Sequence, residues 1–152
     1  RLTGPGVTAE QALAAVGEVR AGAEVIDSRY RDFKFLAGDV IADNASSGAY
    51  LVGELALSPA EIDLIAEPVE LIVDGEVVDT ATGAAVLGNP AEALALAVND
   101  LATRGHSIEP GWLVLTGGMT DAVFAVPGST VSCRFGSLGE VTLYCGDAEA
   151  GS

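Results

Sequence analysis

The sequence predicts an α+β fold, namely a roll of mixed, mainly antiparallel β-sheet with flanking helices. Apolar runs that favour strands outnumber those that favour helices, and the two kinds do not alternate regularly as they would in a doubly wound fold. The dipeptide Asp74-Gly75 lies between two strand-like runs and predicts a tight hairpin. Near the C-terminus, apolar residues alternate in two successive runs, which predicts a second antiparallel hairpin with one buried face.

The N-terminal third begins with a predicted helix near residues 9–20. Thr8 and Gln11 have the spacing of a capping box, and apolar residues follow at helical intervals. A short strand is expected at 23–26, followed by a polar segment. The stretch 39–48 ends in Asn-Ala-Ser-Ser-Gly, a run of turn-forming residues, and a strand is expected at 50–57.

The central part of the chain contains a short helical turn, a hairpin and one long helix. Ser, Pro and Glu at 58–61 occupy the N-cap, N1 and N3 positions of one or two helical turns. Strands at 69–73 and 76–79 flank the Asp-Gly turn. Asn89-Pro90 opens a helix with an apolar stripe, and Arg104-Gly105 closes it.

The C-terminal part is predicted to be mostly strand. A strand at 112–115 ends in a glycine-containing loop at 116–120, and the alternating runs at 131–135 and 141–145 form the last hairpin. Cys133 and Cys145 lie on these two strands, but Cys133 is expected opposite a residue near position 142. Both cysteines are therefore expected to be buried, reduced thiols.

Composition excludes several classes of partner. The net charge of −15, with seven Lys and Arg spread along the chain, argues against nucleic-acid binding. No apolar run reaches the roughly 18 to 20 residues that span a bilayer, and no secretory signal is visible, so we expect a cytoplasmic protein without membrane contacts. The chain starts at Arg1 and runs directly into Gly-Pro-Gly. We expect residues 1–152 to be one domain, the C-terminal part of a longer protein.

Candidate chemistry concentrates between residues 24 and 47, where carboxylate and amide side chains gather between apolar elements. Such oxygen ligands suit Mg²⁺ or Mn²⁺. Glu24 interrupts an apolar strand, which is unfavourable unless the carboxylate binds a metal or pairs with a cation such as Arg20 or Arg29. Both alternatives stay open. His106 is the single histidine and follows a helix end, so we expect a surface residue and no catalytic triad or histidine-ligated zinc.

Three motifs resemble those of a known enzyme family. They are Ala-Glu-Val-Ile-Asp-Ser-Arg-Tyr at 23–30, Asp-Val-Ile-Ala-Asp-Asn-Ala-Ser-Ser at 39–47 and Leu-Thr-Gly-Gly-Met-Thr-Asp at 115–121. Together they resemble the 2-keto-4-pentenoate hydratase and 4-oxalocrotonate decarboxylase branch of the fumarylacetoacetate hydrolase superfamily. The resemblance implies a fumarylacetoacetase C-terminal-like fold and a Mg²⁺ ion held by three acids. Glu24 matches the last of these acids, whereas the upstream Glu-x-Glu motif that supplies the others does not precede it here.

The resemblance implies a lyase acting on a small 2-oxo acid in aromatic hydrocarbon catabolism. The stretches 29–35 and 116–120 resemble those of the decarboxylases more than those of the hydratases, which implies Mg²⁺-dependent decarboxylation of 4-oxalocrotonate to 2-hydroxypenta-2,4-dienoate. One alternative is 2-hydroxypenta-2,4-dienoate hydratase, and another, motivated by the missing Glu-x-Glu, is a catalytically silent structural subunit. The expected assembly is a homo-oligomer, with a partner hydratase as a further candidate.

Candidate site residues follow from the same motifs. Glu24 is the expected metal ligand, and the other candidates are catalytic Lys34 and Asp43 and substrate-binding Asn44, Ser46, Thr116 and Gly117. The turn from Asp43 to Ser46 is expected to share a cavity with Glu24, or else to be only a self-capped loop.

The proposed roles in this site differ in kind. Asn44 would donate to substrate oxygens, while Asp43 would order a metal-bound water or Lys34. Lys34 lies between two phenylalanines and would attract a substrate carboxylate or orient a catalytic acid, unless it is an ordinary surface lysine. Backbone amides near Gly117 would bind a carboxylate, unless the glycines only form a tight turn.

Overall fold

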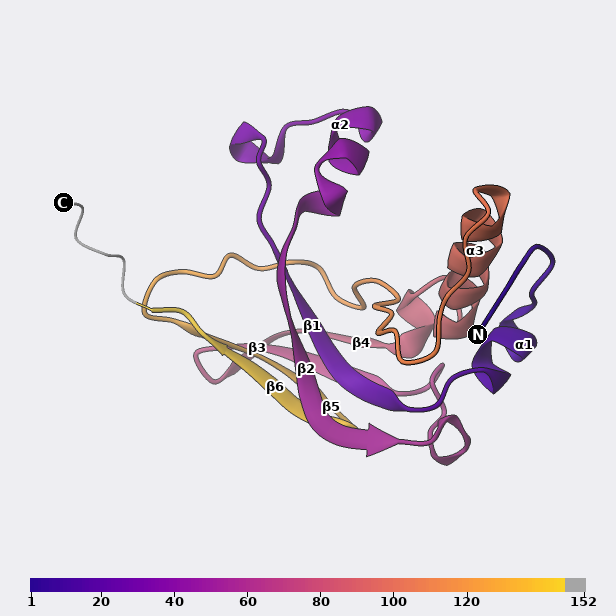
Figure 1. The fold of residues 1–152 in the computed structure, drawn as a ribbon. Helices are drawn as coiled ribbons and strands as arrows, with labels where there is room; N and C mark the ends of the chain where they lie inside the picture. The colour runs from indigo at the N-terminus through magenta and orange to yellow at the C-terminus, as the bar shows by residue number, and fades with distance from the viewer. Residues whose placement is uncertain (147–152) are drawn as a thin grey trace.

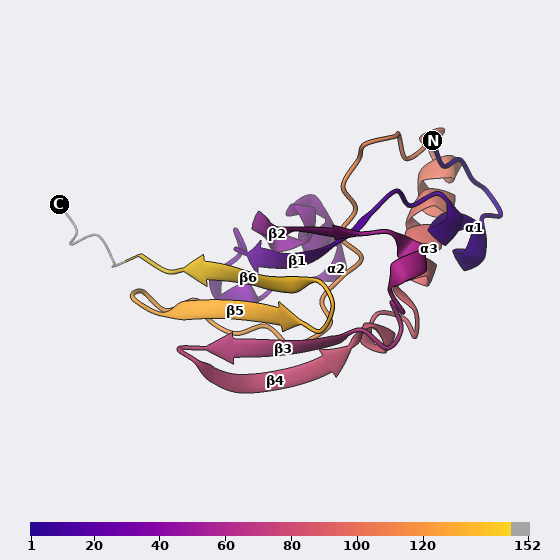
Figure 2. The same cartoon turned by 90° about the horizontal axis from the view of Figure 1, so that it is seen from below.

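The computed structural model describes residues 1–146 and contains two antiparallel sheets. One is a two-stranded ladder of β1 (Val19–Ile26) and β2 (Ser47–Leu57). The other has the strand order β4-β3-β5-β6, with bounds β3 Pro68–Val73, β4 Glu76–Thr82, β5 Thr130–Phe135 and β6 Gly139–Tyr144. Figure 2 shows these four strands side by side, with β1 and β2 beyond β6. The predicted α+β class with mainly antiparallel sheet is confirmed.

The ladder packs against the β5–β6 end of the larger sheet. Ala21, Leu138 and Val141 form its buried apolar cluster, and Phe135 packs at the margin. The approach is close at Gly53, where a Cβ atom would lie 3.2 Å from Ala21 Cβ and 3.5 Å from Val141 Cγ1. Larger side chains here would push the two sheets apart, so close packing fixes the position of the ladder on the four-stranded sheet.

Both predicted hairpins are present. Asp74 and Gly75 have φ of 49° and 87°, the left-handed geometry that a two-residue hairpin turn requires. Asp74 also joins this turn to β5, because its backbone N–H donates to Thr130 O at 2.9 Å and its carboxylate accepts from Thr130 N at 2.8 Å. In the last hairpin Cys133 pairs with Val141, and both cysteines are free thiols that are only partly buried.

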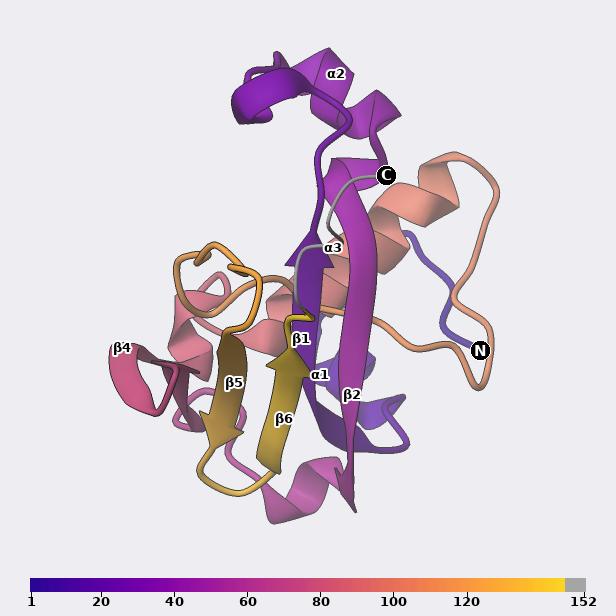
Figure 3. The ribbon, with the colours of Figure 1, turned by 90° about the vertical axis from the view of Figure 1, so that its left-hand side faces the viewer.

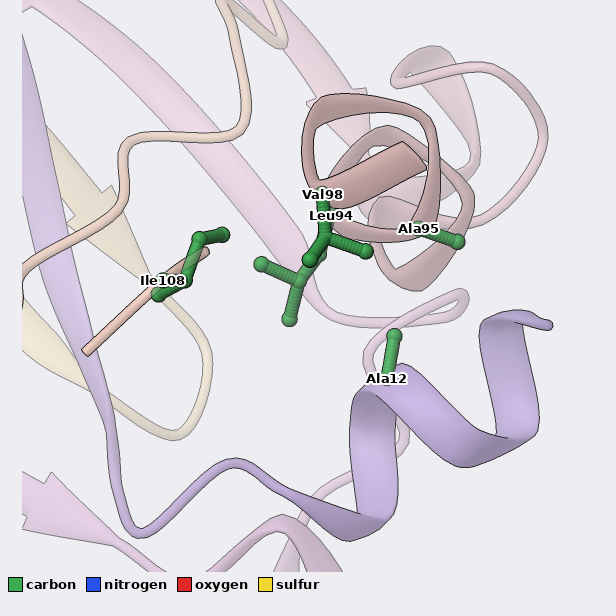
Figure 4. Close-up of a cluster of buried hydrophobic side chains, with 5 residues drawn as sticks. All are labelled: Ala12, Leu94, Ala95, Val98 and Ile108. Atoms are coloured by element: carbon green, nitrogen blue, oxygen red, sulfur yellow. The ribbon is translucent and has the colours of Figure 1, made fainter. Parts of the chain in front are cut away.

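Two helices, α1 (Ala9–Ala14) and α3 (Pro90–Thr103), form a second apolar cluster at one end of the molecule together with Ile108, which follows α3. Figure 4 shows that the buried side chains of this cluster face one another: Ala12, Leu94, Ala95, Val98 and Ile108. We refer to these five residues as the helix cluster. The capping box at Thr8 and the long α3 are confirmed.

The first helix is shorter than predicted. It ends at Ala14, with Ala15 as its C-cap, and not near residue 20. Val16 packs against the helix cluster, but Val19 already belongs to the cluster under β1. The apolar residues at helical spacing therefore pack into two different clusters, and the chain passes from one to the other at Gly17, a residue that disfavours helix.

The predicted strand at 112–115 is absent. The chain there has no regular structure, and Gly111 and Gly117 take φ of 83° and 114°. Trp112 and Leu113 remain 60% and 52% exposed. A strand needs a neighbouring edge with free hydrogen-bonding groups, and this segment pairs with none in the described chain.

An arm formed by residues 27–46 joins β1 to β2 and projects from the sheets (Figures 1 and 3). It contains the helix α2 (Ala37–Ala42) and two 3₁₀ turns, η1 (Arg31–Phe33) and η2 (Asn44–Ser46). Turn structure alone was expected from residue 39 onward, so α2 is a correction. Its start is capped by Asp39, whose carboxylate accepts from Leu36 N at 2.9 Å.

Smaller features agree with the sequence. The turn predicted at 58–61 is the 3₁₀ helix η3 (Pro59–Glu61), and a further 3₁₀ turn, η4 (Gly83–Ala85), follows β4. His106 is exposed, as expected. Over residues 1–146, no helix combines the length and the apolar character needed to cross a bilayer.

Candidate active site

A cavity of about 250 Å³ lies where the arm meets the ladder. Its walls come from the end of β1, from η2 and from the first residue of β2: Glu24, Ile26, Asn44, Ala45 and Ser47. Glu24 and Ile26 are two positions apart on β1, so their side chains point to the same face of the strand. The register Ile26 to Ser47 brings the opposite wall next to them. Residues twenty apart in sequence thus enclose one space.

Glu24 supplies the free carboxylate of this cavity. Neither of the two arginines that were candidate partners pairs with Glu24: Arg20 donates to Glu18 at 2.7 Å, and Arg29 pairs with Asp43. Across residues 1–146, Glu24 makes no ion pair or side-chain hydrogen bond. It is also solvent-exposed, so the desolvation cost that an acid within an apolar strand would otherwise carry does not arise. Strand alternation places Ala23 and Val25 towards the sheet and Glu24 on the accessible face.

Asp43 does not line the cavity but lies buried behind it, with its side chain 4% exposed. Its carboxylate accepts from Arg29 Nε, from Arg29 N at 3.2 Å, and from the hydroxyls of Ser28 and Ser46 at 3.3 and 3.1 Å. Burial alone would raise the pKa of Asp43, but the hydrogen bonds from Arg29 and Ser46 outweigh it and lower the pKa below its usual value. Asp43 is therefore a fully engaged carboxylate.

Arg29 connects the two ends of the turn that forms the cavity wall. In addition to its contacts with the Asp43 carboxylate, its guanidinium donates through Nη2 to Asp43 O and through Nη1 to Ser47 O at 3.1 Å. A planar guanidinium can make these contacts at once because its donors form a rigid fork. We call this Arg29–Asp43 network the clasp.

The turn inside the clasp has an unusual backbone. Asn44, Ala45 and Ser46 have φ of 51°, 54° and 58°, three successive residues in the left-handed region. For residues with a Cβ atom this conformation costs roughly 1–2 kcal/mol each, somewhat less for asparagine. Ser46 is further held by its own backbone, since Ser46 O accepts from Asp27 N at 2.7 Å. The clasp and this hydrogen bond together hold a conformation that the isolated chain would avoid.

The remaining candidate residues lie outside the cavity wall. Lys34 sits on the arm with its side chain 82% exposed, and its Nζ lies 3.8 Å from Asp32 Oδ2. Asp43 contacts Arg29 and not Lys34. Thr116 and Gly117 belong to the irregular segment after residue 110, which passes β1 close to Glu24, since a Cβ atom on Gly22 would lie 3.2 Å from Leu115 Cδ2.

Sequence reasoning missed several residues of the site. Ile26 and Ser47 line the cavity, and Ser28 and Arg29 form the clasp. The period-two alternation of β1 could have identified Ile26 from Glu24. Nothing local could have paired Arg29 with Asp43, fourteen residues away, because that contact depends on how the arm folds back.

The cavity is suited to a hard cation together with an oxygen-rich ligand. A glutamate carboxylate is a preferred ligand of Mg²⁺, which usually shares its coordination between protein, water and substrate. Within residues 1–146, no three acidic, histidine or cysteine side chains cluster closely enough to hold a metal. Glu24 therefore fits such an ion as one member of a ligand set and not as a complete site.

Comparisons with known proteins concern the family and the fold of the chain. The family model for the fumarylacetoacetate (FAA) hydrolase C-terminal domain matches residues 3–143. A 4-oxalocrotonate decarboxylase from Pseudomonas putida is 43% identical over 141 residues, which is 93% of this chain and 53% of the relative. A 2-hydroxyhexa-2,4-dienoate hydratase from Comamonas testosteroni is 35% identical over 142 residues, 93% of this chain and 54% of the relative.

A solved structure shows the same fold. The 4-oxalocrotonate decarboxylase from Pseudomonas putida G7, complexed with magnesium and adipate, superimposes with a TM-score of 0.90 at 43% identity. The match covers 93% of this chain and 54% of that one. The chain thus spans about half the length of the curated relatives it matches.

Proposed function

The chain belongs to the fumarylacetoacetate hydrolase family through its C-terminal domain, and on that premise we propose that it is the C-terminal catalytic portion of a Mg²⁺-dependent 4-oxalocrotonate decarboxylase. The product would be 2-hydroxypenta-2,4-dienoate, as expected in aromatic catabolism. The observation that carries the proposal is the unpaired Glu24 carboxylate facing Asn44 across a small cavity, in a fold shared with a decarboxylase complexed with magnesium and adipate.

The ligands of that relative fit the proposed substrate. Adipate is a six-carbon dicarboxylate, and 4-oxalocrotonate has the same number of carbons and two carboxylates. Identity also favours the decarboxylases, since two further ones are 44% and 45% identical over 93% and 94% of this chain. Two hydratases that cover a similar share of the chain are 35% and 34% identical.

Glu24 would hold the divalent ion together with acids from the half of a full-length relative that this sequence does not span. The ion would be Mg²⁺, with Mn²⁺ as the alternative that the same oxygen ligands accept. When bound, such an ion supplies Lewis acidity at the substrate's 2-oxo oxygen, which favours the enolate that forms as CO₂ leaves. Because Glu24 has no cation partner in residues 1–146, its charge is available for this role.

Asn44 is the proposed substrate-binding residue of the cavity wall, where its amide would donate to substrate oxygens. Asp43 and Ser46 are buried and hydrogen-bonded to each other, so we assign them to shaping the cavity wall and not to contacting the substrate. Lys34, Thr116 and Gly117 remain proposals: Lys34 would attract the remote carboxylate, and the 116–117 backbone would bind it from the β1 side.

The proposed assembly is a homo-oligomer, with a partner hydratase as an additional candidate. Apolar side chains on the arm and on the irregular segment are exposed, among them Leu36 at 78%, Ile41 at 77% and Phe124 at 84%. Exposed apolar surface of this kind is typical of contact regions.

An assay with two substrates tests the proposed reaction. The native protein that contains this sequence would be incubated with 4-oxalocrotonate and with 2-hydroxypenta-2,4-dienoate, each with Mg²⁺ and with a chelator. Release of CO₂ from the first substrate, dependent on Mg²⁺, supports the decarboxylase. Water addition to the second without CO₂ release from the first would support the hydratase instead. If neither reaction proceeds, the result would favour the catalytically silent subunit.

A further inference from the structure

We propose that Arg29 and Asp43 are positioning residues, whose clasp holds the Asn44–Ser46 turn left-handed so that Asn44 faces the cavity shared with Glu24. The inference rests on the proposed function for the role of Asn44. It replaces the catalytic role that the sequence suggested for Asp43, because the Asp43 carboxylate has no free side towards the cavity.

The clasp is placed to control this one turn. A single side chain, Arg29, contacts the residue before the turn through Asp43 and the residue after it through Ser47 O. The Asp43 carboxylate in turn binds the Ser46 hydroxyl at the end of the turn. Any ligand that approaches Asn44 therefore meets a wall whose two ends are fixed to the same guanidinium.

No apolar packing replaces the clasp in the arm. Neither η1 nor α2 has a buried residue, and the buried residues of the arm are the polar pair Asp43 and Ser46. The main contacts of α2 are with η2, and Figure 1 shows α2 in the arm that projects from the sheets. Without the clasp, the hydrogen bond from Asp27 N to Ser46 O would be the main remaining contact between the turn and β1, and it fixes only one end of the three left-handed residues.

The test compares Arg29→Lys with Arg31→Lys in the native protein. Arg31 is a matched control because it is exposed, two residues away and without an ion pair in the described chain. Lysine keeps the charge of Arg29 but lacks the fork that reaches both ends of the turn. We expect Arg29→Lys to weaken binding of adipate in the presence of Mg²⁺ about tenfold, as a misplaced positioning group would. Affinity for Mg²⁺ alone, which depends on Glu24, should stay unchanged.

Two further variants separate positioning from general damage. Because the clasp acts through Asn44, Arg29→Lys should have no additional effect on adipate binding in an Asn44→Ala background. Because glycine takes positive φ without steric cost, Ala45→Gly should restore part of the affinity that Arg29→Lys or Asp43→Asn removes. Additive losses, or no recovery with glycine, would overturn the proposal.

Hydrogen exchange keeps this test independent of the activity. Amides of residues 43–47 should exchange faster in Arg29→Lys and Asp43→Asn than in Arg31→Lys, while amides of α3 stay unchanged. Should the native protein bind neither Mg²⁺ nor adipate, the proposed function fails, and the exchange rates still decide whether the clasp holds the turn. Equal exchange in Arg29→Lys and Arg31→Lys would contradict it.

Discussion

The helix cluster and the arm are ordered by opposite means. In the helix cluster every buried side chain is apolar, and Val98 is completely inaccessible to solvent. In the arm the buried side chains are Asp43 and Ser46, while Leu36 and Ile41 remain exposed. The first region depends on the removal of apolar area from water, the second on charge-assisted hydrogen bonds around one guanidinium. An apolar core thus stabilises the first region, whereas the candidate site borders the second, which polar contacts hold.

Truncating the helix cluster should give the largest effect on global stability. Val98→Ala removes two methyl groups from a site with no access to solvent, so it should lower the free energy of unfolding by about 2 kcal/mol. Chemical denaturation followed by circular dichroism measures this change. Exchange rates in the turn at 43–47 should not change, because the cavity that Val98→Ala creates is in the other region. Faster exchange there would show that the two regions are coupled.

A matched pair of isoleucines sharpens the contrast. Ile108 is 9% exposed in the helix cluster, whereas Ile41 is 77% exposed on the arm. Removing one methylene group by Ile108→Val should cost about 1 kcal/mol of unfolding free energy. Ile41→Val should change it by less than about 0.5 kcal/mol, as expected of a surface position. Equal losses in the same denaturation experiment would mean that Ile41 is covered in the assembled protein.

Acid should loosen the arm before the helix cluster. The pKa of Asp43 is lowered in the folded chain, so its contribution to stability is fully present above the unfolded value and is lost as the pH falls through the folded value. The reference pKa of an aspartate is about 3.9, which places the loss below about pH 4. Backbone resonances of Ala45 and Ser46 should shift in that range while those of Val98 do not. Simultaneous change in both regions would contradict a local clasp.

The same contrast explains what the sequence could predict. The β3–β4 hairpin, the last hairpin and α3 were predicted because periodic apolar residues and the Asp74-Gly75 turn encode them locally. The helix α2 was not predicted, because no residue of it is buried and no apolar period marks it. The false strand at 112–115 shows the converse error, since apolar residues there have no partner edge.

Only those site residues that consecutive elements of the chain bring together could be predicted from the sequence. Glu24 and Asn44 line one cavity because a strand, a turn and a returning strand bring such residues together, whereas Asp43 and Ser46, which were expected in the same wall, do not line it. The clasp was not predictable, since Arg29 and Asp43 meet through the fold of the arm. Burial behind the wall, and not residue type, distinguishes Asp43 from a group that contacts substrate.

The most direct test of the central claim is the affinity of the native protein for Mg²⁺ in Glu24→Gln and Glu54→Gln, measured by isothermal titration calorimetry. Glu54 is the matched control, because it is an exposed glutamate on β2 that does not line the cavity. We expect Glu24→Gln to weaken Mg²⁺ binding by at least about tenfold, because a neutral amide replaces a carboxylate ligand, and Glu54→Gln to leave it unchanged. Equal affinities in Glu24→Gln and the unmodified protein would contradict the assignment of Glu24 as a metal ligand.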